Sequence, residues 1–326
     1  MIERLDAFMA RANAAYYATH DPFADFTTAP EITQVFGEIL GLWAAVTWGL
    51  LGRPDPVLLV EAGPGRGTLM ADALRAVARA APDFRAALSL HLIETSPRLR
   101  AMQAQRLPGA TWHDGLETLP DAPILLLANE FLDALPIRQF VRRGAGWTER
   151  FVGATGLVEQ PSSEDWTGSP ATDGQIAEIC EPARQFVADL AVRLSRHPGA
   201  ALFLDYGPEH AATGDSLQAL AHGRPADPLS PPGSADLTAH VDFPALAAIA
   251  RQGGTEVHGP VPQGMFLARL GLFQRTNRLA RNQPPARAAA LVEAAQRLAE
   301  PHRMGRLFKA LALSRPGVGA LPGFAA

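Results

Sequence analysis

Residues 57–68, with the sequence VLLVEAGPGRGT, constrain the fold more than any other stretch of this chain. The run Val57–Val60 is entirely apolar, as in a strand that is buried on both faces of a parallel sheet. One acid, Glu61, and three alternating glycines follow, and a helix is predicted from Thr68 to about Ala80. A strand, a glycine turn and a helix in this order indicate an α/β fold.

The three glycines of the turn are Gly63, Gly65 and Gly67, and they permit backbone angles that a side chain would forbid, so a ligand can lie against the main chain. Glu61 can accept two ribose hydroxyls or face a cationic group. Nicotinamide dinucleotide sites prefer a third glycine where this chain has Thr68, and a P-loop needs a Gly-Lys pair. The turn instead resembles the first motif of class I S-adenosylmethionine (SAM) methyltransferases. The alternative is a strand-to-helix turn without a ligand.

Composition describes an ordinary globular protein of 326 residues, with 47% hydrophobic and 19% charged residues. This length fits one large α/β domain with insertions, or about two domains. The net charge of −4 argues against a general nucleic-acid binder, whose surface would be basic. The longest apolar stretch, residues 39–52, is too short to cross a bilayer and predicts a buried helix, not membrane insertion.

Cys180 is the single cysteine, so no intramolecular disulfide can form, and a reducing compartment is compatible with the sequence. We interpret it as a small core residue rather than a nucleophile. The first residues carry charges where a secretory signal has its apolar segment, which predicts a cytoplasmic protein. No His/Cys/Asp cluster has the spacing of metal ligands, so no metal site is predicted.

Further predicted strands end in polar residues. Glu94 follows the strand 88–93 and is expected to bind the ribose hydroxyls of an adenosine. Asp114 follows the strand 110–113, where an adenine edge could be read, although a simple turn acid fits as well. Strand 122–128 leads into Asn129, and strand 199–205 ends in Asp205. Because the ends of parallel strands meet at one sheet edge, these residues predict a ligand crevice.

Residues 129–136 carry the acids on which we base the acceptor side of the site. Glu130 and Asp133 are three positions apart, so both carboxylates would point the same way from one helical turn. A pair of carboxylates suits a guanidinium group, which is planar and always charged. The alternative is that Glu130 caps a turn and Asp133 is solvated.

The N-terminal part predicts a helix over residues 2–17 and a second helix that begins near Pro30. Thr28 can cap this second helix, with Glu31 in its positive first turn, as in many ordinary helices. The aromatic and hydroxyl side chains between Tyr16 and Thr28, Phe26 among them, can equally form a lid over a ligand.

The remaining pattern predicts a β-hairpin over residues 138–152, a mobile connection over 153–176 and a helix from Glu181 to about Arg196. Residues 208–241 show no periodicity and contain His240, which can contribute to a substrate mouth, although a structural hydrogen bond is the favoured role. Helix 243–251, strand 255–258, a mostly helical segment 263–296, a final strand 307–313 and a loose tail 314–326 complete the chain. Four arginines form a basic stripe that is either a solvated helix face or a surface for an acidic protein partner; they are Arg275, Arg278, Arg281 and Arg287.

Several motifs together resemble the MidA-like family of SAM-dependent methyltransferases. They span nearly the whole chain: DFTTAPEITQVFGE (25–38), EAGPGRGTL (61–69), LIETSP (92–97), NEFLDALP (129–136), DYG (205–207), GSADLTAHVDF (233–243) and MGRLF (304–308). One departure is Ala24, where the family is expected to have glycine. The family includes a mitochondrial complex I assembly methyltransferase that dimethylates an arginine of a core subunit.

The resemblance implies SAM as cofactor and a protein substrate, such as a complex I subunit. It implies cofactor binding by the glycine turn, Glu61, Glu94, Asp114 and Asn129, and catalytic roles for Glu130 and Asp133. Residues on the substrate side or in a lid would be Phe26, Thr28, Glu31, Asp205 and His240.

The predicted architecture is a Rossmann-like class I methyltransferase core with a seven-stranded, mostly parallel sheet. Residues 1–52 would form a helical cap, and residues 53–313 the core, with insertions at about 137–178, 208–241 and 263–300. Two other functions stay open: a SAM-binding assembly module without turnover, and a small-molecule methyltransferase. A nicotinamide dehydrogenase is the weakest alternative because of Thr68.

Overall fold

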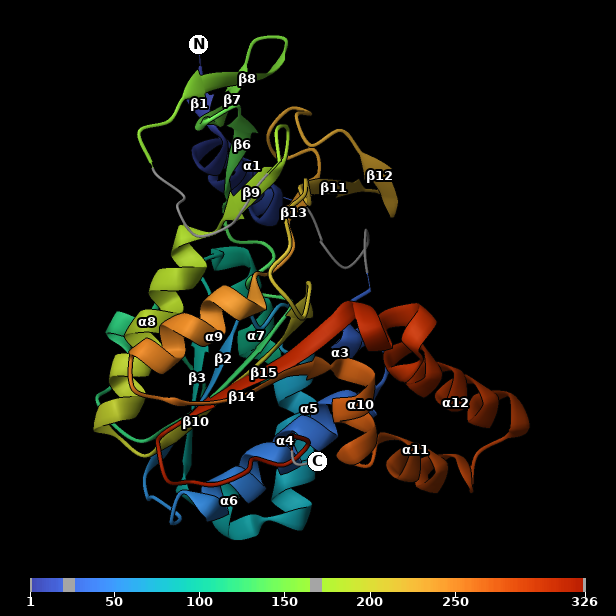
Figure 1. The fold of residues 1–326 in the computed structure, drawn as a ribbon. Helices are drawn as coiled ribbons and strands as arrows, with labels where there is room; N and C mark the ends of the chain where they lie inside the picture. Colours follow the sequence, from blue (N-terminus) through green and yellow to red (C-terminus); the bar gives the residue numbers. More distant parts are fainter. Residues whose placement is uncertain (1, 20–26, 165–171, 325–326) are drawn as a thin grey trace.

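A central sheet of seven strands forms the core of the computed structural model, which describes residues 2–19, 27–164 and 172–324 (Figure 1). Strand β15 runs antiparallel to both of its neighbours, and every other neighbouring pair is parallel. The seven-stranded, mostly parallel sheet predicted from the sequence is therefore confirmed. In order across the sheet, the strands are β14 (Glu256–Pro262), β15 (Phe308–Ser314), β10 (Gly199–Tyr206), β5 (Ile124–Asn129), β2 (Val57–Ala62), β3 (Leu88–Ile93) and β4 (Thr111–His113).

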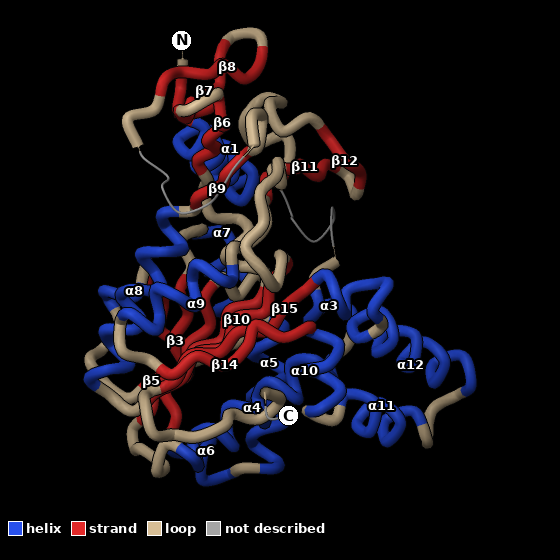
Figure 2. Tube along the Cα trace, in the orientation of Figure 1, coloured by secondary structure: helices blue, strands red, loops and turns tan. Residues whose placement is uncertain are grey.

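Helices cover both faces of this sheet, which is why its central strands are continuous apolar runs (Figures 1 and 2). On one face, α8 (Glu181–Arg196) and α9 (Phe243–Gln252) pack Val187, Leu190 and Leu246 against the strands. On the other face lie α4 (Gln34–Leu50), α5 (Thr68–Ala80) and α6 (Pro82–Ala87). Helix α7 (Pro97–Arg106) links β3 to β4.

Helix α4 is the buried helix predicted from the apolar stretch, and it packs closely on α5. A Cβ atom on Gly41 would lie 2.7 Å from the Cα of Ala73, so only glycine allows the two helices to approach this closely. The Thr33 hydroxyl accepts a hydrogen bond from the backbone N–H of Val35 at 3.3 Å and caps α4. The predicted helix near Pro30 is a separate short helix, α3 (Ala29–Ile32); Thr28 occupies its N-cap position as expected, but its side chain makes no cap bond.

A second group of elements, here called the outer lobe, lies beyond the carboxyl ends of the core strands (Figure 2). It contains α1 (Leu5–Thr19), a five-stranded antiparallel sheet and a three-stranded sheet. The first sheet comprises β1 (Glu3–Arg4), β6 (Arg138–Arg143), β7 (Gly146–Gly153), β8 (Gly156–Pro161) and β9 (Ile176–Ile179); the second comprises β11 (Gln218–Ala221), β12 (Arg224–Ala226) and β13 (Asp236–Thr238).

Three expectations about the outer lobe need correction, while the predicted β6–β7 hairpin is confirmed. Residues 1–52 do not form one cap, because α1 lies in the lobe and α4 lies on the core. Part of the expected mobile connection forms the edge strand β8, which pairs with β7. Residues 208–241 contain a three-stranded sheet. Its strands are three or four residues long, too short to produce a recognisable alternation.

Helix α1 is fixed to the lobe by apolar packing and by Asn13. Phe8 and Met9 are buried in a cluster that also includes Leu237. The Asn13 side-chain amide donates hydrogen bonds to the carbonyl oxygens of Ala134 at 3.0 Å and Leu237 at 2.8 Å, and its oxygen accepts one from the Leu237 N–H at 3.0 Å. These bonds hold α1 across the carboxyl edge of the core sheet.

The C-terminal part forms helices α10 (Gln263–Arg269), α11 (Leu272–Ala280) and α12 (Pro285–Ala299), then a π-helical turn, η2 (Pro301–Gly305), before β15. Beyond β15 the chain packs on the core instead of forming the loose tail expected from its glycines and prolines. Leu321 is fully buried, and the Trp43 indole N–H donates a hydrogen bond to the Pro322 carbonyl oxygen at 3.2 Å. No helix within the described ranges is long and apolar enough to span a membrane.

Candidate functional site

A cavity of about 690 Å³ lies at the carboxyl ends of β2, β3, β4 and β5, between the core sheet and helix α1. Its volume is in the range of sites that bind small molecules, about 300–1,000 Å³. Residues from four strand ends, α1, α3 and α8 line it. Of the predicted site residues, the cavity is lined by Thr28, Glu31, Glu61, Gly63, Gly65, Glu94, Asp114, Asn129 and Glu130.

The glycine turn has the left-handed backbone that its sequence predicted, with φ of +67° at Gly63, +52° at Gly65 and +76° at Gly67. The Gly63 N–H donates to the Ile93 carbonyl oxygen at 3.1 Å, which ties the turn to β3. A Cβ atom on Gly63 would lie 2.9 Å from the Phe131 ring. Gly67 does not line the cavity; it is the N-cap of α5.

Gln103 on α7 supports two parts of the cavity wall at once, and the sequence reasoning missed it. Its side-chain amide donates to the Gly65 carbonyl oxygen at 2.8 Å and to a Glu94 carboxylate oxygen at 3.3 Å. Its own oxygen accepts a hydrogen bond from the Trp112 indole N–H at 2.8 Å. The side chain is fully buried. The feature that distinguishes Gln103 is the burial of its side-chain amide on one face of α7, and a single sequence does not show which amides are buried.

Glu94 is held in a defined orientation at the end of β3. One carboxylate oxygen accepts the Ser96 N–H at 2.8 Å, and the other accepts Gln103. Burial raises the pKa of Glu94, with the hydrogen bonds acting in the opposite direction. Asp114 lies at the cavity edge and is ion-paired with Arg100 at 2.6 Å. Because the Asp114 side chain is 75% exposed, it reaches a ligand only at the rim.

Glu61 and Asn129 present buried polar atoms without partners. Glu61 is 3% exposed, and burial raises its pKa well above the usual range of a carboxyl. Within the described part of the chain, no hydrogen bond reaches Glu61 Oε2 or Asn129 Oδ1. Buried polar atoms are normally paired, so two orphaned oxygens on one cavity wall indicate a missing polar ligand.

Glu130 is the carboxylate at the end of β5, and its backbone has the unusual φ of +50°. Its Oε1 accepts the Ala29 N–H and the Asn129 side-chain N–H, both at 3.0 Å. Burial raises the pKa of Glu130. The expected helical turn over residues 129–136 is wrong: the chain forms an irregular turn there, because the left-handed residue breaks any helix at its start.

Asp133 and Asp205 do not line the cavity, in contrast to the expectation that they face the substrate. Asp205 Oδ2 accepts the N–H groups of Phe131, Leu132 and Asp133, at 3.1, 2.9 and 3.3 Å. Burial raises the pKa of Asp205 to about 7. Burial, followed by the neighbouring charge of Asp205, also raises the pKa of Asp133 well above its usual range. Asp205 therefore supports the turn that carries Glu130, and Asp133 is a buried residue of that turn.

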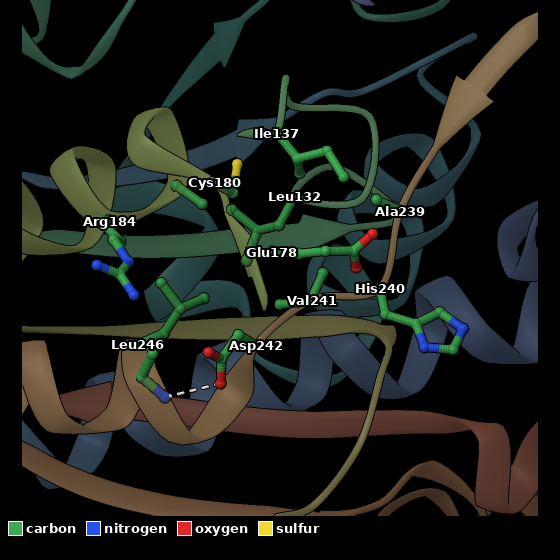
Figure 3. A pocket seen from close by; sticks show the side chains of 12 residues that line it. Leu132, Ile137, Glu178, Cys180, Arg184, Ala239, His240, Val241, Asp242 and Leu246 are labelled. Atoms are coloured by element: carbon green, nitrogen blue, oxygen red, sulfur yellow. Dashed lines mark hydrogen bonds between the residues drawn. The ribbon is translucent and has the colours of Figure 1, made fainter. Parts of the chain in front are cut away.

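His240 also lies outside the main cavity. Figure 3 shows it at the edge of a separate, small pocket that Glu178, Cys180 and Asp242 also line. Its backbone N–H donates to the Ser216 hydroxyl at 2.8 Å, and its ring lies edge-on to the Tyr206 ring. Burial raises the pKa of the neighbouring Cys180 thiol to about 12, so this thiol is not ionised at neutral pH.

The segment before α4 closes the cavity on one side. Thr28 and Glu31 line it, and Glu31 Oε1 accepts a hydrogen bond from the Thr68 hydroxyl, at the start of α5, at 2.5 Å. Phe26, the other predicted lid residue, lies outside the described residues. Within the described ranges, no group of three or more His, Cys, Asp and Glu side chains has the arrangement of a metal site.

The cavity fits a SAM-sized ligand with positive charge. The left-handed glycines carry no side chain that could cover their backbone, so a ligand can contact the main chain there. A Cβ atom at Gly63 would also meet the Phe131 ring. Several carboxylates line the wall and disfavour an anion, and the two orphaned oxygens of Glu61 and Asn129 can accept donors from a ligand. This chemistry matches a molecule with hydroxyl and ammonium donors and a sulfonium group.

Comparison with known proteins agrees with this geometry. The sequence model of a family described as S-adenosyl-L-methionine-dependent methyltransferase matches residues 39–261. The chain is 35% identical, over 97% of its length and 81% of the relative, to the mitochondrial protein arginine methyltransferase NDUFAF7 homolog of Drosophila melanogaster. It is 33% identical to the mitochondrial protein arginine methyltransferase NDUFAF7 of Homo sapiens, with coverage of 91% and 76%.

Among solved structures, a Burkholderia thailandensis protein bound to S-adenosyl-homocysteine superposes with a TM-score of 0.83. The two sequences are 26% identical, and the match covers 99% of this chain and 90% of the Burkholderia chain. These matches confirm the MidA-like family, the class I fold and the cofactor that the sequence predicted. The chain therefore belongs to the family of S-adenosyl-L-methionine-dependent methyltransferases.

Proposed function

We propose that this chain transfers a methyl group from SAM to a guanidinium nitrogen of a protein arginine. The observation that carries the proposal is the position of Glu130, a carboxylate on the cavity wall whose Oε1 is anchored by two N–H donors. Within the described residues, the side-chain hydrogen bonds of Glu130 go to Oε1, which leaves Oε2 for the guanidinium of the methyl acceptor. The relatives named protein arginine methyltransferases support the same substrate class.

The cofactor side of the proposal uses the residues around the glycine turn. Gly63 and Gly65 would lie against the cofactor, Gly67 would start the helix behind it, and Glu94 would accept the ribose hydroxyls. Glu61 and Asn129 would accept donors through their orphaned oxygens, and Asp114 would contact the rim of the ligand. When bound, SAM supplies an electrophilic methyl group on a positively charged sulfur.

On the acceptor side, Glu130 would hold the guanidinium by a charge-assisted hydrogen bond and so orient one nitrogen towards the cofactor. A guanidinium is charged at physiological pH, so orientation and proximity supply most of the rate enhancement. The nitrogen would gain the methyl group as the carbon–sulfur bond of SAM breaks, and S-adenosyl-homocysteine would be the leaving group. The same nitrogen would release one proton to water, so the product guanidinium keeps its charge. Asp133 and Asp205 would act on this step only through the turn that positions Glu130.

The protein partner is proposed to be a respiratory complex I subunit, which rests on the family resemblance. A cytoplasmic location is part of the same proposal, whereas the relatives are named as mitochondrial proteins.

The test uses labelled SAM and a lysate from a strain that lacks this gene. We expect purified protein to label a protein band, and mass spectrometry to find methylarginine in a complex I subunit only when the gene is present. Glu130→Gln should abolish the label, whereas the control Asp83→Asn, on the exposed surface of α6, should retain it.

Two results would contradict the proposal. Saturable SAM binding by calorimetry without any label would indicate a binding module. Label in the low-mass fraction alone would indicate a small-molecule methyltransferase.

A further inference from the structure

Residues 263–306, here called the helical arm, carry a charge opposite to that of the whole protein. They contain eight arginines, two glutamates and no aspartate or lysine, whereas the complete chain has a net charge of −4. The arm comprises α10, α11, α12 and the turn η2. An excess of one charge sign within a single segment marks a surface that attracts ligands of the opposite sign.

The arm offers a helix surface that the rest of the described chain does not cover. Figure 1 shows α11 and α12 projecting from the side of the core. Of the fifteen residues of α12, only Ala295 and Leu298 are buried. Phe273 on α11 and Val292 on α12 are large apolar side chains that remain exposed. A helix pair with this much exposed surface has an unpartnered face.

Some arginines anchor the arm, and others are left for a partner. Arg275 pairs with the buried Glu38 of α4 at 2.7 Å, and Arg303 pairs with Glu293 at 2.5 Å. By contrast, Arg278, Arg281 and Arg287 are exposed, and no ion pair joins them to any residue in the described ranges. The second group is therefore available without disturbing the packing of the arm.

The arm also lies next to the acceptor side of the cavity. Strand β15, which follows α12 and η2, begins with Phe308 paired to Tyr206 at the carboxyl end of β10. The charge of Arg297, in the last turn of α12, partly offsets the rise that burial causes in the pKa of Glu130. The carboxyl end of α12 thus leads to the edge of the sheet at which Glu130 lies, while α11 and the start of α12 project from the core (Figure 1). A protein whose arginine enters the cavity would meet the arm with the neighbouring part of its chain.

We propose that the helical arm binds an acidic segment of the protein whose arginine is methylated. This inference rests on the proposed function for its biological meaning. Arginine forks bind carboxylates bidentately, and the exposed Phe273 and Val292 add apolar contact. A long nucleic acid is disfavoured because the remainder of the chain is acidic and repels phosphate. A membrane surface is disfavoured because the exposed face of α12 is mainly alanine and arginine.

The experiment measures binding of a fluorescent decaglutamate peptide to the full chain by anisotropy. Two matched triple variants are compared: Arg278→Gln/Arg281→Gln/Arg287→Gln in the arm, and Arg79→Gln/Arg85→Gln/Arg196→Gln, which are exposed arginines on other helices. Loss of three exposed ion pairs should weaken peptide binding by about tenfold in the arm variant, and by less than about twofold in the control. Added salt should remove the difference.

Equal peptide affinity of the two variants would overturn the inference. Tighter binding of a single-stranded RNA, or of vesicles of phosphatidylserine and phosphatidylcholine, would also overturn it. Methyl transfer to an arginine peptide without acidic residues is measured separately. That second assay reports on the proposed function alone, so either idea can fail while the other stands.

Discussion

The Asp205 carboxylate on β10 accepts the backbone N–H of Leu132, in the turn after β5, at 2.9 Å. The same oxygen accepts the N–H groups of Phe131 and Asp133. One buried side chain thus holds three consecutive backbone donors of the turn that begins at Glu130. It fixes the turn from beneath and does not touch the cavity itself.

Asp205→Ala should therefore destabilise the protein by about 3 kcal/mol or more, because it leaves several buried donors unpaired. The control Asp242→Ala removes the N-cap of α9, where the carboxylate accepts the Ala245 N–H, and should cost only about 1 kcal/mol. Urea denaturation measures both values. A similar loss in the two variants would show that the three bonds to the turn contribute little.

Gly63→Ala should weaken SAM binding by at least about tenfold. A left-handed backbone costs a residue with a side chain about 1–2 kcal/mol, and the new Cβ would lie 2.9 Å from the Phe131 ring. Gly49→Ala is the matched control, because this glycine is exposed in helix α4 with nothing within 4 Å of its Cβ position. Calorimetry with SAM checks the prediction, and unchanged affinity in Gly63→Ala would contradict it.

Gln103→Leu should lower SAM affinity while the protein still folds, since it removes the amide that holds both Gly65 and Glu94. Trp112 would lose its acceptor, which costs about 1–3 kcal/mol of stability for one buried donor. Gln105→Leu changes an exposed glutamine of the same helix and should leave SAM affinity unchanged. If both variants bound SAM as the wild type does, the supporting role of Gln103 would be wrong.

His91 and His113 predict a dependence of stability on pH. Their ring nitrogens lie 2.9 Å apart, and burial lowers the pKa of each below the ordinary value of about 6.5. The folded state therefore binds fewer protons than the unfolded state near that pH. The stabilisation is present above about pH 6.5 and is lost as the pH falls towards the lowered folded values.

The measurement is the difference in unfolding free energy between the wild type and His91→Gln/His113→Gln across this pH range. Taking the difference removes the opposite contribution of Asp205, whose raised pKa favours folding at lower pH. The advantage of the wild type should shrink as the pH falls. A difference in unfolding free energy that stays constant from neutral to acidic pH would show that this histidine pair does not cause the pH dependence of stability.

Much of the core was predictable because its signals are local. The apolar run ending in Glu61 and the glycines specify a strand, a turn and a helix within a dozen residues, and several later strands end in a polar residue or lead directly into one. Parallel strands then bring those ends to one edge, which is why Glu94 and Asn129 were expected near Gly63. Short strands such as β12 and β13 carry no comparable pattern and were missed.

Residue type alone could not predict which acidic side chains face the cavity. Glu130 and Asp133 are equally acidic in the sequence, yet Glu130 lines the cavity, whereas Asp133 is buried and does not line it. The left-handed backbone at Glu130 and the three bonds to Asp205 separate them. The bonds come from β10, which lies more than seventy positions further along the chain.

The sequence by itself determined the α/β core, the glycine turn and the family, because these depend on periodicity and on residues that are neighbours in the chain. Only the tertiary structure decided that α1 crosses the cavity, that Gln103 supports its wall, and that Asp205 acts through the turn. Each of these depends on hydrogen bonds between segments far apart in sequence. Such bonds exist only once the strands and helices have packed, so no local pattern records them.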